Sequence, residues 1–286
     1  MRATQIVGAA LRLWSENWLR WGLVTLALSG VPSVLEAAID PWTATYGARY
    51  WFGERPFSLP EPDPLASVVG LVTAFLLAPW LYVILAKGTL DAASERRPSA
   101  LIGRTIRGVP SVLWLFAIIV ACVAAVVVPI FAVLVNATRD ASLEDRQAVF
   151  GLLALVMLGV VVWLGPRLAV LFHVFVAEDI RGTKAIGQAW RRSRGAWSTC
   201  FGVIALNVLI AIGVTLIPAL LANRFFALPT MEDAVPRAIV FALINVILTP
   251  IGVAILAALY LELSARKGSL SQVSLQRNLA RFDPSP

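Results

Sequence analysis

The sequence predicts an all-α membrane protein with six transmembrane helices, arranged as three parallel two-helix repeats that each begin with a cytoplasmic amphipathic helix. Three observations carry this prediction. Of the 286 residues, 59% are hydrophobic and 14% are charged, whereas a soluble domain carries about 25% charged residues. The apolar residues gather in long runs, and short motifs recur three times in the same order. We therefore expect residues 1–286 to form a single integral membrane domain.

Six apolar segments are long enough to cross a membrane as helices. About 20 apolar residues span a hydrocarbon core of ~30 Å. The backbone of a segment in lipid must satisfy its own hydrogen bonds, which favours helices. A membrane β-barrel would alternate polar and apolar residues, and these segments do not. The predicted spans are residues 18–38, 65–87, 111–135, 148–177, 199–222 and 238–261.

The distribution of Lys and Arg predicts the orientation of the chain. Seventeen of the 24 basic residues belong to one set of segments and six to the other. The basic set comprises the N-terminal segment through Arg20, residues 87–110, residues 178–198 and the C-terminal tail. The other set comprises residues 39–64, 136–147 and 223–237. Basic residues accumulate in cytoplasmic connections, so both termini are predicted to be cytoplasmic. This bias also explains the net charge of +7, and we expect no nucleic-acid partner.

A threefold internal repeat organises these spans. A motif of the form branched apolar, Gly, any, small, apolar, Arg precedes each odd-numbered span, and it covers residues 7–12, 102–107 and 186–191. Each odd-numbered span has a proline near its outer end, at Pro32, Pro129 and Pro218. Each even-numbered span contains Leu-x-Pro, which ends at Pro79, Pro166 and Pro250. An acid follows each of these three prolines by twelve residues, at Asp91, Glu178 and Glu262.

Each repeat unit is an amphipathic interfacial helix, a span, an outer loop and a return span. Because a unit contains two spans, every copy enters the membrane from the same side. The units are therefore parallel repeats related by an axis along the membrane normal. They cover approximately residues 5–90, 100–178 and 184–264, and a cytoplasmic tail follows at 265–286.

The three repeated acids predict ion pairs with the amphipathic helices. Each acid closes an even-numbered span at its cytoplasmic end, where the helix dipole disfavours a negative charge. The Gly-containing motifs place an arginine at the same depth in each unit, at Arg12, Arg107 and Arg191. We expect at least two of the acids to pair with these arginines or with arginines next to them. The alternative is that the acids face water.

Arg167 and the Leu-x-Pro prolines are the candidate functional positions inside the spans. A charge within the membrane is costly and is by default a functional hypothesis. Arg167 either snorkels toward the cytoplasmic headgroups and pairs structurally, or it binds a ligand. The prolines Pro79, Pro166 and Pro250 each remove a backbone donor. The resulting kinks either open a cytoplasm-facing cavity or only shape the bundle.

The sequence offers no pattern for enzyme chemistry. His173 is the single histidine, and Cys122 and Cys200 lie in different predicted spans. Clustered metal ligands, glycine-rich phosphate loops and nucleophile motifs are not found. We expect no catalytic residues, no metal and no cofactor.

Three stretches resemble a known family. They are residues 167–178, residues 189–195 and residues 257–267. They resemble motifs of the glycerophosphoryl diester phosphodiesterase membrane domain family, a group of six-span bacterial membrane proteins. The family's Asp-Leu-Arg near the end is Glu262-Leu263-Ser264 here. The resemblance implies a multi-pass protein of the bacterial cytoplasmic (inner) membrane. It implies no soluble phosphodiesterase domain, because such a barrel needs about 250 residues.

These observations predict a non-enzymatic integral membrane scaffold or accessory subunit that binds a membrane partner or lipids. The outer segment 40–64 is rich in aromatic residues, which belong at the headgroup level. It lies on the outer face of the membrane or docks another membrane protein. The alternative function is a small transporter or lipid-handling protein with a cytoplasm-facing cavity between Pro-kinked helices.

Overall fold

A computed structural model describes most of the predicted spans. It covers residues 3–41, 63–94, 158–160, 162–178, 180, 183–225 and 234–267, together with scattered residues between 110 and 155. The described part is 94% helix with no strands. Five of its helices are long and apolar enough to cross a membrane. The protein is therefore all-α and has the helices of a membrane-embedded chain.

The five candidate spans coincide with the first, second, fourth, fifth and sixth spans predicted from the sequence. They are Ala3–Ile39, Pro64–Ala93, Leu158–Glu178, Trp197–Thr215 and Ala234–Arg266. The predicted third span, residues 111–135, lies largely outside the described residues. Six spans and the threefold repeat therefore stay predictions. The C-terminal tail beyond Lys267 and the segment 42–62 also lie outside the described residues.

The first two candidate spans are each divided by one wide helical turn. The first consists of α1 (Ala3–Thr25), the π-helix η1 (Leu26–Gly30) and α2 (Val31–Ile39). The second consists of α4 (Pro64–Val72), η2 (Thr73–Leu77) and α5 (Ala78–Ala93). Asp63 caps α4, because its carboxylate accepts from the backbone N–H groups of Leu65 and Ala66.

The two π-helices are explained by the prolines that follow them. Pro32 comes one residue after the start of α2, and Pro79 one residue after the start of α5. A proline inside a helix lacks an N–H and crowds the carbonyl four residues earlier, and a π turn relieves this crowding. The donors that close these wide turns bond five residues back, Val31 to Leu26 and Ala78 to Thr73. Pro250, by contrast, lies within the uninterrupted α12 (Ala234–Arg266).

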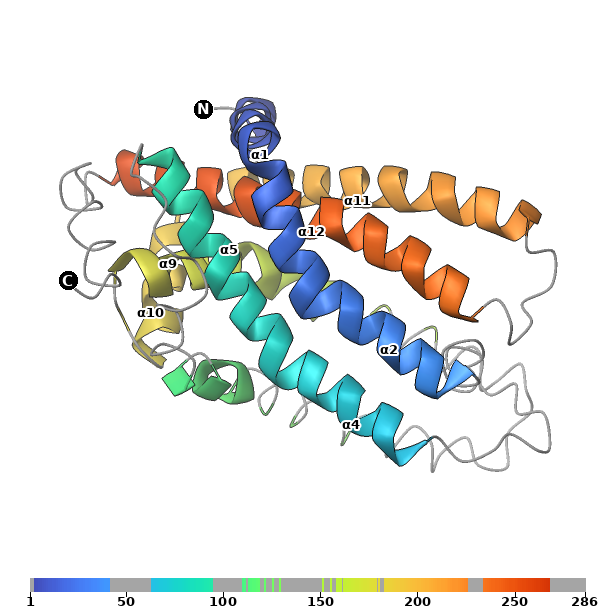
Figure 1. Ribbon diagram of the computed structural model, residues 1–286. Coiled ribbons are helices and arrows are strands. Elements are labelled where there is room, and N and C mark those ends of the chain that lie inside the picture. Colours follow the sequence, from blue (N-terminus) through green and yellow to red (C-terminus); the bar gives the residue numbers. More distant parts are fainter. Residues whose placement is uncertain are drawn as a thin grey trace, which may run out of the picture.

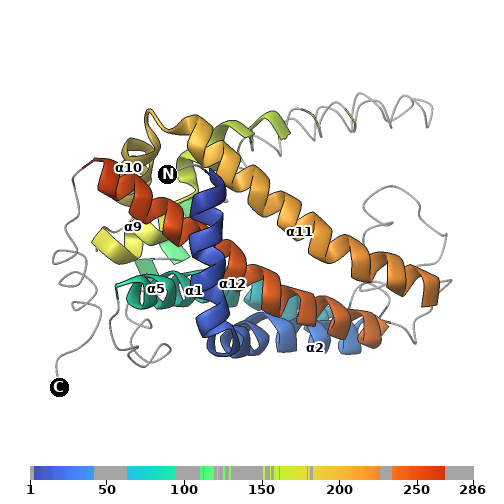
Figure 2. The ribbon, with the colours of Figure 1, turned by 90° about the horizontal axis from the view of Figure 1, so that it is seen from above.

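The α9 and α10 helices form one end of the bundle, and α11 begins there. After a turn at residues 169–170, α9 (Leu171–Glu178) is followed by α10 (Thr183–Ser193) and α11 (Trp197–Phe225). Figures 1 and 2 place α10 across the end of the bundle where α12 finishes. We call this the α10 end. The α10 helix stops at Gly195, whose φ of 82° lies in the left-handed region that glycine adopts without strain.

The packed core lies at the α10 end. It joins residues from both ends of α1, nearly all of α5 beyond Leu81, α9 and the second half of α12. The α1 helix crosses α12 and packs against it (Figure 2). Toward the other end, α11 diverges from α12, and both helices expose large apolar side chains there. Such faces suit contact with lipid chains.

Candidate functional site

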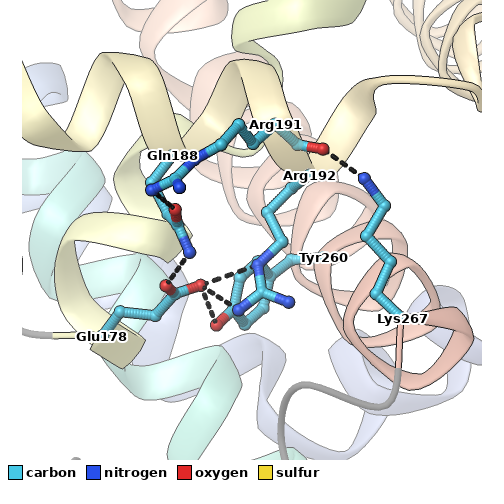
Figure 3. Close-up of polar contacts among 6 residues, drawn as sticks. All are labelled: Glu178, Gln188, Arg191, Arg192, Tyr260 and Lys267. Atoms are coloured by element: carbon cyan, nitrogen blue, oxygen red, sulfur yellow. Dashed lines mark hydrogen bonds and ion pairs between the residues drawn. The ribbon is translucent and has the colours of Figure 1, made fainter.

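A buried carboxylate joins three helices at the α10 end. Glu178 is the last residue of α9. Its Oε1 accepts from Arg192 Nε at 3.0 Å and from the Tyr260 hydroxyl at 3.1 Å. Its Oε2 accepts from Gln188 Nε2 at 2.7 Å. Arg192 and Gln188 belong to α10 and Tyr260 to α12 (Figure 3). We call these four residues the Glu178 cluster.

The Glu178 cluster is shielded from solvent. The side chains of Arg192 and Glu178 are 6% and 9% exposed, with Arg192 Nη2 2.8 Å from the carboxylate. Tyr260 is fully buried. Burying two opposite charges has a large desolvation cost, which is offset only when geometry is good and further hydrogen bonds satisfy the groups. The donors from Gln188 and Tyr260 supply those bonds. The cluster therefore fixes α10 against both α9 and α12.

Arg167 makes a second set of contacts between the fourth span and α10. Its guanidinium carbon lies 4.4 Å from the ring centroid of Trp163 and 4.3 Å from that of Trp190. Both distances are within the range of a cation–π interaction. The Arg167 carbonyl accepts from the Ser193 hydroxyl at 3.1 Å. These contacts favour the structural interpretation of Arg167 over a ligand-binding one.

The end of α12 also bonds to α10. Lys267 Nζ donates to the backbone carbonyl of Arg191, and the Arg191 guanidinium donates to the Gln188 side-chain oxygen (Figure 3). Gln188 thus receives a bond from Arg191 and gives one to Glu178. The polar network runs from the exposed surface of α10 to the buried carboxylate.

The α10 helix has one buried face and one basic face. Ala185, Ala189, Arg192 and Ser193 are buried against the bundle. Lys184, Arg191 and Arg194 are exposed. Lys184 and Arg191 are seven positions apart, which places them on one side of α10, and Arg194 lies in the turn directly after the helix. We call them the basic face of α10.

The repeated acids have different partners in the described parts of the three units. Glu178 pairs with Arg192, the arginine next to Arg191, and this confirms the predicted contact in one unit. Asp91 pairs instead with Lys87 at 2.9 Å, and both side chains are almost completely buried. Glu262 pairs with Arg266 at 2.9 Å.

The pairs of Asp91 and Glu262 lie within single helices, four residues apart. That spacing puts the two side chains on the same side of a helix, and it could have been read from the sequence. Arg12 is exposed on α1, and Arg107 lies outside the described residues. The contact to an amphipathic helix is thus shown for one of the three acids.

Two polar residues of the spans were missed by sequence reasoning. Tyr260 carries no sequence signal for its role, since a tyrosine in an apolar run is ordinary. Glu36 does carry one, because it lies inside the predicted first span and an acid there is as costly as Arg167. The Glu36 side chain is half-buried beside Gly70 of α4.

Other candidate groups are packed into the core. His173 is buried and its ring lies 6.3 Å from that of Tyr260. Cys200 is a buried free thiol. Within the described residues, no three His, Cys, Asp or Glu side chains are grouped so that they could hold a metal ion.

Comparisons with known proteins assign no family to this arrangement. No family model matches the chain, and no curated protein or solved structure matches it at significant similarity.

Proposed function

We propose that the protein is a non-enzymatic integral membrane scaffold or accessory subunit whose α10 helix binds anionic phospholipid headgroups. One observation carries the proposal: the Glu178 cluster holds α10 across the end of the bundle with its basic face outward. The helix is placed near the level of the span ends, where headgroups lie. Basic residues near a membrane surface are each worth about 1 kcal/mol in binding anionic lipid.

The topology proposed with this function comes from the charge distribution. The α10 end is then cytoplasmic, with both termini on that side of a bacterial inner membrane, and a sixth span completes three parallel repeats. Reporter proteins fused at Arg55 or Asp145 should read as external. A cytoplasmic reading at either position would reject the topology.

Membership in the glycerophosphoryl diester phosphodiesterase membrane domain family is a further proposal. The three stretches that carry the resemblance supply Arg167, Glu178, Arg192 and Tyr260. All four take part in the contacts that hold α10, three of them in the Glu178 cluster and Arg167 through its stacking with Trp190. This convergence supports a common structural purpose for the three stretches.

The alternative function, a small transporter or lipid-handling protein with a cytoplasm-facing cavity between Pro-kinked helices, gains less support. A ligand at Arg167 would compete with the rings of Trp163 and Trp190, which both contact its guanidinium. Docking of another membrane protein on residues 40–64 stays a proposal, because most of this segment lies outside the described residues.

Lipid analysis after purification in mild detergent tests the proposal. The wild-type protein should retain phosphatidylglycerol, and the variant with Lys184, Arg191 and Arg194 all changed to Gln should retain at least tenfold less, because three charges near the surface are removed. Arg12→Gln, which removes a single exposed arginine on α1, is the control and should reduce retention by no more than about fivefold. Equal retention by the triple variant would reject the lipid-binding function of α10.

A further inference from the structure

The α2 and α4 helices lie at the end of the bundle opposite to α10 (Figure 1). A shallow, widely open groove of about 630 Å³ lies between α2 and the helix pair α4–η2. Its lining includes Glu36, Ser67, Gly70, Leu71, Ala74 and Ala78. The backbone N–H of Asp63 donates to the Asp40 carboxylate at 3.1 Å, which joins α2 and α4 beside the groove.

Glu36 is the charged residue of this groove. It lies one helical turn before Asp40, where α2 ends. Its Oε1 would be 2.8 Å from a Cβ atom placed on Gly70, so the carboxylate lies directly against the glycine backbone. Within the described residues, no hydrogen bond or ion pair reaches this carboxylate. An acid at membrane depth is costly without a counter-charge, and a cation bound in the groove would supply one.

The groove changes from polar to apolar along its length. Glu36 and Ser67 lie toward the span ends, and Ala74 and Ala78 lie deeper along the helix. Thr73 lies beside Ala74, and its hydroxyl is bonded back to the Val69 carbonyl at 2.8 Å. The eight helical steps from Gly70 to Ala78 rise about 12 Å at 1.5 Å per residue. One leaflet accounts for about half of a ~30 Å hydrocarbon core. The groove thus matches a single leaflet in both depth and polarity.

We propose that this groove binds one phospholipid whose headgroup carries a primary amine, such as phosphatidylethanolamine. The ammonium group donates to Glu36, and an acyl chain lies along Leu71, Ala74 and Ala78. A trimethylated choline headgroup has no N–H to donate, so the site discriminates between the two headgroups. The site is separate from the basic face of α10 in charge and position, and neither proposal depends on the other.

A basic side chain on a partner's membrane helix is the rival occupant of the groove. The change from polar to apolar along the groove favours a lipid, because a lipid has this polarity and a transmembrane helix is apolar on both sides of its basic residue. The rival is an outcome of the experiment that follows.

Native mass spectrometry of the full chain tests the proposal. The protein is released from detergent micelles after incubation with equal amounts of phosphatidylethanolamine and phosphatidylcholine of the same acyl chains. Wild-type protein should retain the ethanolamine lipid over the choline lipid by about fivefold, the size expected for the net contribution of one hydrogen bond. Glu36→Gln keeps the shape and removes the charge, and it should abolish this preference. Glu16→Gln, an exposed acid of α1, should leave it unchanged.

A second variant fills the groove without touching the charge. Ala74→Leu should reduce retention of both lipids at this site by about fivefold or more, whereas Ala38→Leu, on an exposed position of α2 that does not line the groove, should not. Equal retention of the two lipids by wild-type protein would overturn the proposal. So would an unchanged preference in Glu36→Gln. A membrane protein that co-purifies with wild type and is lost from Glu36→Gln, with lipid retention unchanged, would also overturn it and assign the groove to a partner helix.

Discussion

The two ends of the bundle are held together by different interactions, and α12 passes through both. From Pro250 to Ser264, α12 has no exposed residue. Before Pro250, it exposes every second or third side chain, as at Leu243, which is 54% exposed. The α10 end adds buried ion pairs at Glu178–Arg192 and Lys87–Asp91. The opposite end, where α2 and α4 lie, has exposed apolar faces and the groove beside Glu36.

The difference shows where a membrane bundle needs polar contacts to hold its helices together. Lipid chains are as apolar as leucine, so an exposed apolar helix face costs little in a membrane and does not drive helices together. Close packing and polar contacts must do so instead. Here both are concentrated at the α10 end, which leaves the faces of α4 and α11 available to lipid.

The largest expected effect is the loss of Glu178. Glu178→Ala leaves the buried Arg192 without its counter-charge and the Tyr260 hydroxyl without an acceptor. Removing one partner of a buried pair costs about 3–5 kcal/mol. The unfolding free energy, measured by SDS titration from mild detergent, should fall by that amount. Glu16→Ala is the control, since Glu16 is exposed, and it should change the free energy by less than about 0.5 kcal/mol. Equal effects of the two substitutions would show that the buried Glu178 ion pair does not stabilise the α10 end.

A matched pair of leucines on α12 compares packing at the two ends directly. Leu259 is fully buried and Leu243 is 54% exposed. Leu259→Ala should lower the free energy of unfolding by about 2 kcal/mol, near the lower limit for a buried leucine. The expected loss is small because helix packing within a membrane does not remove the leucine from water. Leu243→Ala should cost less than about 0.5 kcal/mol. A large effect at Leu243 would instead show that another helix covers this face.

A smaller effect is expected at Arg167. Arg167→Gln removes the cation that contacts the rings of Trp163 and Trp190, and a desolvated cation–π contact is worth about 2 kcal/mol. The free energy of unfolding should fall by about 1–2 kcal/mol, and Arg167→Lys should restore part of this loss. If Arg167→Gln left stability unchanged but abolished binding of a specific solute, the ligand-binding interpretation would replace the structural one.

The sequence was sufficient for the elements governed by local rules. Long apolar runs located five spans, and the basic residues together with their apolar spacing located α10 as an amphipathic helix. The repeated acid led to the Glu178–Arg192 contact. The two described motif glycines remain without a packing reason, since a Cβ at Gly8 or Gly187 would meet nothing within 4 Å, and Gly103 lies outside the described residues.

Other features depend on which helices meet, and no local pattern contains that information. Tyr260 reaches Glu178 across 82 residues of sequence. The stacking of Trp190 on Arg167 requires the turn that follows residue 168. The π turns ahead of Pro32 and Pro79 could have been suspected from proline chemistry. Their form depends on how the helix relaxes, since Pro250 is accommodated without one.

The central claim is that a buried ion pair locks α10 onto the bundle. A double-mutant cycle with Glu178→Gln, Arg192→Met and the two combined tests it most directly, with SDS unfolding as the measurement. Each single substitution strands a charged or polar group, whereas the double variant strands neither charge. The account predicts that the double variant loses at least about 1 kcal/mol less than the sum of the two single losses, as expected for directly interacting residues. Losses that add to within about 0.5 kcal/mol would contradict it.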